Sequence, residues 1–230
     1  IGKDVAAVFN FLKFNYQLPK YEVLLVSPHS SRPGLVERID REIENARLGY
    51  RAMMTLKCNN LVDRQLTLKL YEASQAGVKI RLVVRGMCTL LPGIKGVSEN
   101  IKAISIIDRY LEHPRVYVFH NRGQPEYLLG SADLMTRNID YRVEVLCPIK
   151  NPAVQQQLQD VLDQQWQDNV KARVLDSKQN NHLLPRAKAT PVLQSQEMIH
   201  RYFATGKKPR MPRSLMRQAS KRRRHATRKD

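Results

Sequence analysis

The 230-residue chain has little of several features that define whole classes of protein. Its only cysteines, Cys58, Cys88 and Cys147, lie far apart without a Cys-x-x-Cys pair. We therefore expect reduced thiols rather than a disulfide framework or a zinc site. No apolar run approaches the roughly 18 residues that a membrane-spanning helix needs. Ile1 and Asp4 do not fit the start of a signal peptide, so we expect a fragment of a longer polypeptide.

Acidic residues are also scarce, with 21 Asp and Glu against 39 Lys and Arg and a formal net charge of +18. The hydrophobic content of 42% still supports a substantial core and excludes wholesale disorder. Residues 206–230 hold 11 basic residues against Asp230 alone, a net charge of +10. We expect this segment to be a disordered polybasic tail that contacts a polyanion. The alternative is an end that only improves solubility.

Hydrophobic periodicity divides most of the chain into strands and helices. Compact apolar runs predict strands over residues 21–26, 52–56, 78–84, 103–107, 116–119, 127–129 and 143–146. Apolar positions at helical spacing predict helices over residues 5–14, 33–48, 61–75, 152–166 and 192–202. The early strand–helix alternation is typical of parallel strands with crossover helices. We therefore predict an α/β fold with a mixed, largely parallel sheet flanked by helices.

Two short motifs place cations next to predicted strands. Arg85 leaves the end of a strand in Val83-Val84-Arg85-Gly86, and the carboxyl ends of strands in open α/β sheets bind ligands. A guanidinium group there matches phosphate oxygens; an ordinary salt-bridging arginine at a domain edge is the alternative. His113 and Arg115 enter a later strand two residues apart and so face the same way. An imidazole can attack phosphorus or exchange a proton, but a purely structural histidine is the alternative.

A third motif combines small residues with charges. Ser131-Ala132-Asp133 follows a predicted strand, and such small side chains allow close approach of a ligand. Arg137 and Arg142 add two cations, and Glu144 is placed to orient a histidine or an arginine. A plain turn beside a salt-bridged strand is the alternative. The remaining histidines have no convincing partner, and we expect them to be solvated: His29, His120, His182, His200 and His225.

Together these motifs resemble one half-site of the phospholipase D superfamily. That pattern is His-x-Lys, then a small-residue turn, then an acid; here Arg115 stands in place of the lysine. Two such half-sites normally face each other, and this chain contains one.

Longer stretches resemble the C-terminal catalytic part of bacterial polyphosphate kinase. They cover residues 24–28, 83–88, 110–113 and 131–140, and the resemblance extends over about residues 1–190. It implies a phospholipase-D-like domain over 1–190. The sequence pattern itself adds a helix over 191–205 and the tail over 206–230. The resemblance also implies reversible, magnesium-dependent transfer of the terminal phosphate of ATP to polyphosphate through a phosphohistidine. The tail has no counterpart in the family.

The resemblance assigns roles to three residues of this chain. Arg85 and Arg142 correspond to arginines at the nucleotide phosphates, and His113 corresponds to a second histidine that assists transfer. The phosphorylated histidine belongs to a His-Ala-Lys segment that this chain lacks, and we expect the Mg²⁺ ligands outside the chain as well. ATP, ADP and inorganic polyphosphate are the implied ligands. The resemblance also implies that the full-length enzyme is a homo-oligomer. It implies a location in the cytoplasm, with peripheral attachment to a membrane as the alternative.

Two other functions fit the same residues. A phospholipase-D-type nuclease or phosphodiesterase half-site, acting as a homodimer, predicts a covalent intermediate on His113 and diester hydrolysis without ATP. A non-enzymatic polyanion-binding module predicts that affinity depends on the tail. In the kinase interpretation we expect little turnover from this chain alone.

Overall fold

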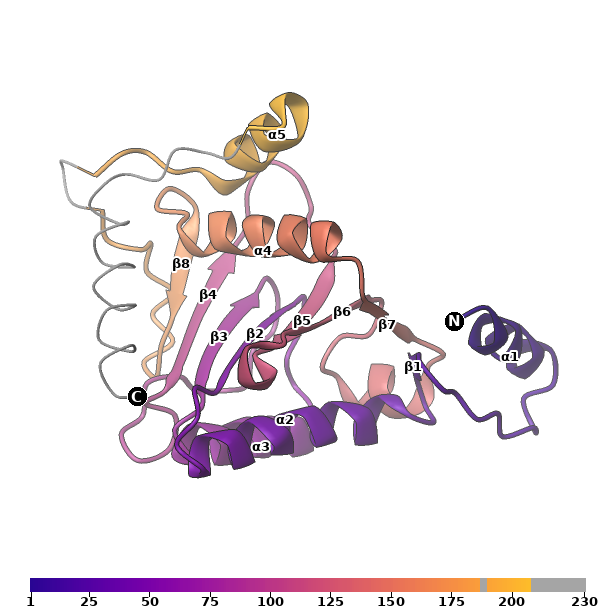
Figure 1. Ribbon diagram of the computed structural model, residues 1–230. Coiled ribbons are helices and arrows are strands. Elements are labelled where there is room, and N and C mark those ends of the chain that lie inside the picture. Colours follow the sequence, from indigo (N-terminus) through magenta and orange to yellow (C-terminus); the bar gives the residue numbers. More distant parts are fainter. Residues whose placement is uncertain (187–189, 208–230) are drawn as a thin grey trace.

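The computed structural model describes residues 1–186 and 190–207, and in them eight strands form one mixed sheet between layers of helices (Figure 1). The strand order is β1-β7-β6-β5-β2-β3-β4-β8. The strands are β1 (Leu25–Val26), β2 (Met53–Cys58), β3 (Lys79–Val84), β4 (Ile101–Ile106), β5 (Arg115–Phe119), β6 (Glu126–Gly130), β7 (Val145–Ile149) and β8 (Ala172–Leu175). The helices are α1 (Gly2–Lys13), α2 (Ser31–Arg47), α3 (Arg64–Gln75), α4 (Pro152–Trp166) and α5 (Ser195–Thr205), with short turns η1 (Asn121–Gly123) and η2 (Arg137–Tyr141).

The predicted α/β class is confirmed, but the expectation of a largely parallel sheet is wrong. Among the described strands, β2, β3 and β4 are parallel neighbours, and the other five pairings are antiparallel. The physical reason is the length of the connections. Only residues 120–125 separate β5 from β6, whereas a parallel crossover needs a dozen residues or more. The second half of the sheet is therefore built from hairpins.

The first and last strands differ from the sequence pattern. The strand predicted over 21–26 is reduced to the two residues of β1, because the carboxylate of Asp4 accepts the backbone N–H groups of Glu22, Val23 and Leu24 at 2.8–3.2 Å. Those groups are then not available to a neighbouring strand. Conversely, β8 was not predicted, since its four residues give too short a pattern. It pairs antiparallel with β4 at the sheet edge.

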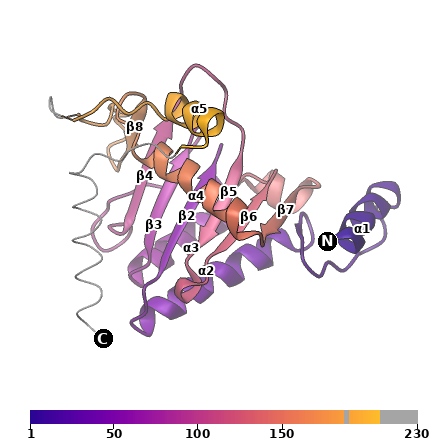
Figure 2. The same cartoon turned by 45° about the horizontal axis from the view of Figure 1, so that its top comes forward.

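Helices cover the two faces of the sheet unequally. Helices α2 and α3 lie together on one face of the sheet (Figures 1 and 2). Their side chains Ile43 and Leu70 are completely buried in the main core. On the other face α4 crosses the sheet and buries Leu162, and α5 packs against α4. Helix α1 lies beyond β1 at the end of the sheet, and its Val8 packs with Leu24 and Val26. None of the helices in residues 1–186 and 190–207 is both long and apolar enough to cross a lipid bilayer.

The predicted polybasic tail falls almost entirely outside the described residues. Gly206 ends α5 in a left-handed conformation with φ of 65°, and Lys207 follows it. The rest of the tail, residues 208–230, is not described, so its expected disorder stays a prediction.

A partly buried ion network joins the helical layer to the loop after β6. Arg32 of α2 donates to Asp63 at 2.7 and 2.9 Å and to Asp140 of η2 at 2.6 and 2.8 Å. Asp63 also caps α3 by accepting the N–H of Leu66, and it accepts the Thr136 hydroxyl at 2.7 Å. Burial alone raises the pKa of Asp63, but these donors outweigh it and lower the pKa from 3.8 to about 2.

We expect Asp63 to make the fold sensitive to acid. Its folded pKa lies below its unfolded value, so its stabilisation is complete above about pH 4 and is lost as the pH falls toward 2. A pKa difference of nearly two corresponds to about 2.5 kcal/mol. Urea unfolding at pH 5 and at pH 2 measures this, with Asp63→Asn expected to lose less stability than the wild type. Asp40→Asn, on an exposed helix surface, is the matched control; equal losses in wild type and Asp63→Asn would refute the role of Asp63.

Candidate active site

Five strand ends bring polar side chains to one edge of the sheet. Because β2 and β3 are parallel and β5 is antiparallel to β2, the ends of β2 and β3 lie beside the start of β5. The end of β6 and the start of β7 reach the same edge through antiparallel pairing. They surround an open pocket of about 450 Å³. It is lined by Asn59, Asn60, Arg85, His113, Arg115, Gly130, Ser131, Asp133, Arg137, Asn138, Arg142 and Glu144.

All three residues that the resemblance singled out line this pocket: Arg85, His113 and Arg142. They lie up to 57 positions apart in the chain and are brought together by the sheet. Gly130, at the end of β6, lets the neighbouring backbone at Val145 come close to this strand end. A Cβ on Gly130 would lie 1.9 Å from the carbonyl oxygen of Val145, so only glycine fits at this strand end.

Asp133 and Arg115 form the buried base of the pocket. Arg115 donates through Nε and Nη2 to the two carboxylate oxygens of Asp133, each at 3.1 Å. Asp133 also accepts the backbone N–H of Asn59 at 2.7 Å and the side-chain amide of Asn60 at 3.2 Å. Burial alone raises the pKa of Asp133, but these donors outweigh it and lower the pKa below its ordinary value. The carboxylate is thus kept ionised and fully occupied.

Arg115 also determines which ring nitrogen of His113 carries the proton. Its Nη1 lies 2.7 Å from Nδ1 of His113 and donates to the His113 carbonyl oxygen at 2.8 Å. A guanidinium group has donors and no acceptor, so Nδ1 must accept. The proton of the neutral imidazole is then on Nε2. The exposed His113 ring can therefore offer an Nε2–H donor to an anion in the pocket.

Arg85 is positioned by Asn59, the residue that follows β2. The Nε and Nη2 atoms of Arg85 donate to Oδ1 of Asn59 at 3.2 and 3.1 Å. Asn59 thus contacts both Arg85 and Asp133, and it links the half-buried arginine to the base of the pocket. The sequence interpretation missed Asn59 and Asn60. Their position directly after a predicted strand, at the same edge as Arg85, was a usable signal.

Two further arginines line the exposed side of the pocket. Arg137 and Arg142 are both exposed, and no carboxylate of residues 1–186 or 190–207 forms a salt bridge with either. Glu144 was expected to orient a histidine or an arginine; instead it accepts the side-chain amide of Asn138 at 2.6 Å. Both carboxylates of the pocket are thus engaged, while the arginines face an open space suited to an anion.

The same engagement argues against a metal site in the pocket. Asp133 is fully occupied by Arg115, Asn59 and Asn60, which leaves Glu144, held by Asn138, as a single acidic side chain among the described residues of the pocket. Within the described part of the chain, no group of three or more His, Cys, Asp or Glu side chains is arranged to hold a metal ion. The described residues therefore do not fit Mg²⁺, and we assign it no step here.

The histidines outside the pocket follow the prediction only in part. His182 and His200 are exposed, as expected, and His225 lies outside the described residues. His29, however, is half-buried, with its ring 4.5 Å from that of Phe11 and stacked on Tyr21. His120 is also half-buried, and burial followed by the charge of Arg51 lowers its pKa. The rings of Phe11 and Tyr21 cover His29, whereas His120, directly after β5, is partly covered and has a backbone hydrogen bond with Arg51.

Comparison with known proteins identifies the family of this chain. Residues 24–196 match the family described as polyphosphate kinase C-terminal domain 2. The polyphosphate kinase of Salmonella typhimurium is 48% identical over 209 residues, which are 91% of this chain and 30% of that protein. That of Vibrio parahaemolyticus is 47% identical over 203 residues, 88% of this chain and 29% of that protein. The chain thus spans about three tenths of the length of these curated relatives.

Solved structures agree in the fold. The crystal structure of polyphosphate kinase from Porphyromonas gingivalis has a TM-score of 0.84 and 37% identity, covering 88% of this chain and 31% of that one. Nuc, a phospholipase D family member from Salmonella typhimurium, has a TM-score of 0.50 and 15% identity, covering 67% and 97%, and so shares the fold alone. With a family match that runs from β1 into α5, this chain belongs to the polyphosphate kinase C-terminal domain 2 family.

Proposed function

We propose that this chain forms one half of the active site of a polyphosphate kinase. That enzyme transfers the terminal phosphoryl group of ATP to inorganic polyphosphate, reversibly. The observation that carries the proposal is the convergence of Arg85, His113, Arg137 and Arg142 on one open pocket whose carboxylates are already engaged. Phosphoryl transfer depends chiefly on positioning and on stabilising charge at the phosphate oxygens, and guanidinium groups supply both.

The reaction has two steps with this chain in a supporting role. A histidine outside the chain attacks the terminal phosphorus of ATP; a P–N bond forms as the P–O bond to ADP breaks. The end oxygen of polyphosphate then attacks the same phosphorus, and the P–N bond breaks. Arg85, Arg137 and Arg142 hold the negative oxygens in both steps. His113 donates from Nε2 to a phosphoryl oxygen, because its Nδ1 is occupied by Arg115.

The wider setting of the enzyme belongs to the same proposal. Its ligands are ATP, ADP and polyphosphate, and Mg²⁺ is held by groups outside this chain. The enzyme acts in the cytoplasm as a homo-oligomer. The names of the relatives support the substrates.

A chimeric kinase tests the proposal. We define it as the Salmonella typhimurium relative with this chain in place of its matching 209 residues. It should make polyphosphate from ATP, and Arg85→Ala and Arg142→Ala should each raise the KM for ATP at least tenfold, since each removes charge-assisted hydrogen bonds worth roughly 1.5–3 kcal/mol. Arg201→Ala, an exposed change on α5, is the matched control with unchanged kinetics.

The alternatives predict different outcomes in the same assay. The nuclease alternative predicts that the protein hydrolyses a phosphodiester without ATP and forms a covalent intermediate on His113. That result would replace the kinase interpretation by a nuclease half-site. That chemistry needs a nucleophilic nitrogen in the pocket, whereas the Arg115 contact favours a proton on Nε2. Binding that disappears only on deletion of residues 206–230 would favour a polyanion-binding module.

A further inference from the structure

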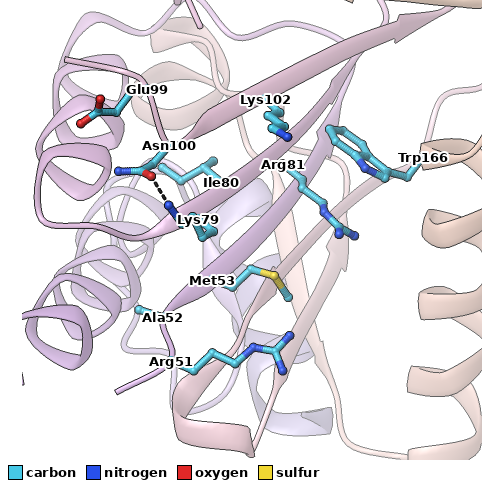
Figure 3. Close-up of a pocket in the computed structure, with 10 residues that line it drawn as sticks. All are labelled: Arg51, Ala52, Met53, Lys79, Ile80, Arg81, Glu99, Asn100, Lys102 and Trp166. Carbon is cyan, nitrogen blue, oxygen red and sulfur yellow. Dashed lines mark hydrogen bonds between the residues drawn. The ribbon is translucent and has the colours of Figure 1, made fainter. Parts of the chain in front are cut away.

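A second basic groove lies at the opposite ends of the parallel strands from the active site. It has a volume of about 450 Å³ and opens on the face of the sheet that α4 crosses (Figure 3). The starts of β2, β3 and β4 form its floor, and Trp166 at the end of α4 forms one wall. None of the roles assigned above uses this groove.

Cations form a row across the three strands. Arg51 precedes β2, Lys79 and Arg81 lie on β3, and Lys102 lies on β4. Arg81 and Lys102 are paired in register, and neighbouring strands are about 4.8 Å apart, so the charges follow one another across the sheet. Among the described residues that line the groove, Glu99 is the one carboxylate, and Figure 3 shows it at the margin, directed away from Arg51 and Arg81.

Two of these cations are held by neighbouring side chains, and the other two are available to a ligand. The guanidinium group of Arg81 lies 5.3 Å from the centre of the Trp166 ring and 3.9 Å from Asp163, which orients it beside the wall. Lys79 is hydrogen-bonded to the side chain of Asn100. Arg51 and Lys102 are exposed, and within the described residues neither forms a salt bridge. Such a cluster, with cations not neutralised by neighbours, attracts a polyanion.

We propose that this groove binds inorganic polyphosphate away from its reacting end. The inference rests on the proposed function, since it takes its ligand from that reaction. A bare phosphate chain fits better than a single-stranded nucleic acid, which needs aromatic side chains on which successive bases stack. Among the described residues that line the groove, Trp166 is the one aromatic, and Arg81 already packs against its ring.

The separation of the two sites gives the groove a function. Lys79 begins the six-residue strand β3 and Arg85 follows its end, so the sites are roughly 20 Å apart. A long polyphosphate can contact both, whereas ATP and short phosphates can occupy only one at a time. Two contacts on one ligand raise its overall affinity through effective concentration. The groove would thus favour long chains and keep them attached between transfers.

Trp166 provides a local signal for the test, because it is the only tryptophan in the chain. Titrating the 230-residue chain with long-chain polyphosphate should change its tryptophan fluorescence in a saturable way. The double variant Arg51→Gln/Lys102→Gln should raise the apparent Kd roughly tenfold. It should also reduce the slope of log Kd against log salt by about 1.4, or about 0.7 for each phosphate group that the variant no longer neutralises.

Two matched controls distinguish binding at this groove from the effect of net charge and from binding at the active site. Lys3→Gln/Lys178→Gln removes the same charge from exposed positions elsewhere and should leave the midpoint unchanged. With tripolyphosphate, which is too short to span both sites, Arg85→Ala/Arg142→Ala should also leave it unchanged. An oligonucleotide that produced the stronger response would reassign the groove to nucleic acid and overturn the proposal.

Two results would end the inference without touching the proposed function. One is a fluorescence signal that polyphosphate does not change; the other is a midpoint shifted equally by both double variants. In either case the chimeric kinase can still be active. Conversely, a groove that passes these tests while the chimeric kinase transfers no phosphate would stand as a polyphosphate site, and the proposed reaction would fall.

Discussion

Replacing His113 by alanine in the chimeric kinase is expected to lower the rate of polyphosphate synthesis by about 100- to 1,000-fold. That range is the typical cost of removing one hydrogen-bond donor that stabilises charge in a transition state. The reason lies in the contact with Arg115, which makes Nδ1 an acceptor and leaves Nε2 to donate. The measurement is the initial rate of polyphosphate formation at saturating ATP.

Two amide variants make this prediction specific to Nε2. The side-chain amide of His113→Gln can place an N–H near the position of Nε2 and should recover at least tenfold of the loss. The shorter His113→Asn reaches only the position of Nδ1 and should recover nothing. His182→Ala, at an exposed histidine, is the control with normal activity. Near-normal synthesis by His113→Ala would show that His113 has no role in the mechanism. Equal rescue by both amides would show that Nε2 is not the donor.

Replacing Asp133 by alanine is expected to destabilise the fold by about 3–5 kcal/mol, because it leaves the buried guanidinium group of Arg115 without its partner. For a chain of this size, that corresponds to a fall in melting temperature of roughly 6–20 °C. The same change removes the acceptor of the Asn59 N–H. Calorimetry or thermal unfolding followed by circular dichroism gives the value.

An exposed carboxylate provides the comparison. Asp40 pairs with Lys69 at 2.9 Å on the helix surface, and Asp40→Ala should cost no more than about 1 kcal/mol. Asp133→Asn keeps the size and one acceptor and should lie between the two. If Asp133→Ala melted at the same temperature as Asp40→Ala, the Arg115–Asp133 pair could not be what holds the base of the pocket.

The early part of the fold was predictable because its signals are local. The helix α2 and the strand β3 each carry an unbroken hydrophobic pattern, and Arg85 stands at the end of β3 where strand-end ligands are expected. The strand before α2 was overestimated since nothing in its own residues shows that Asp4, 18–20 positions away, takes up its N–H groups. Such contacts depend on tertiary structure.

The candidate site was predictable in its residues but not in its contacts. Arg85, His113 and Arg142 were identified through a resemblance between long motifs, and their shared pocket depends on strand directions that the pattern does not contain. The antiparallel entry of β5 places His113 beside the ends of β2 and β3. The pairing of Glu144 with Asn138 was missed because several arginines lie near Glu144 in the sequence. Nothing in that pattern indicates that an amide would be its partner.

The pocket is assembled from strand ends that range from Asn59 to Glu144, and this has a consequence for how the protein folds. The β6–β7 hairpin contains Arg137 and Arg142, but Arg85 and His113 lie at the ends of β3 and β5, so full affinity should arise only when the central strands have all paired. Such long-range pairing is slow and comes late in folding. Phosphate ligands would then bind the finished domain almost exclusively, and by mass action they would protect the whole sheet against unfolding rather than one loop.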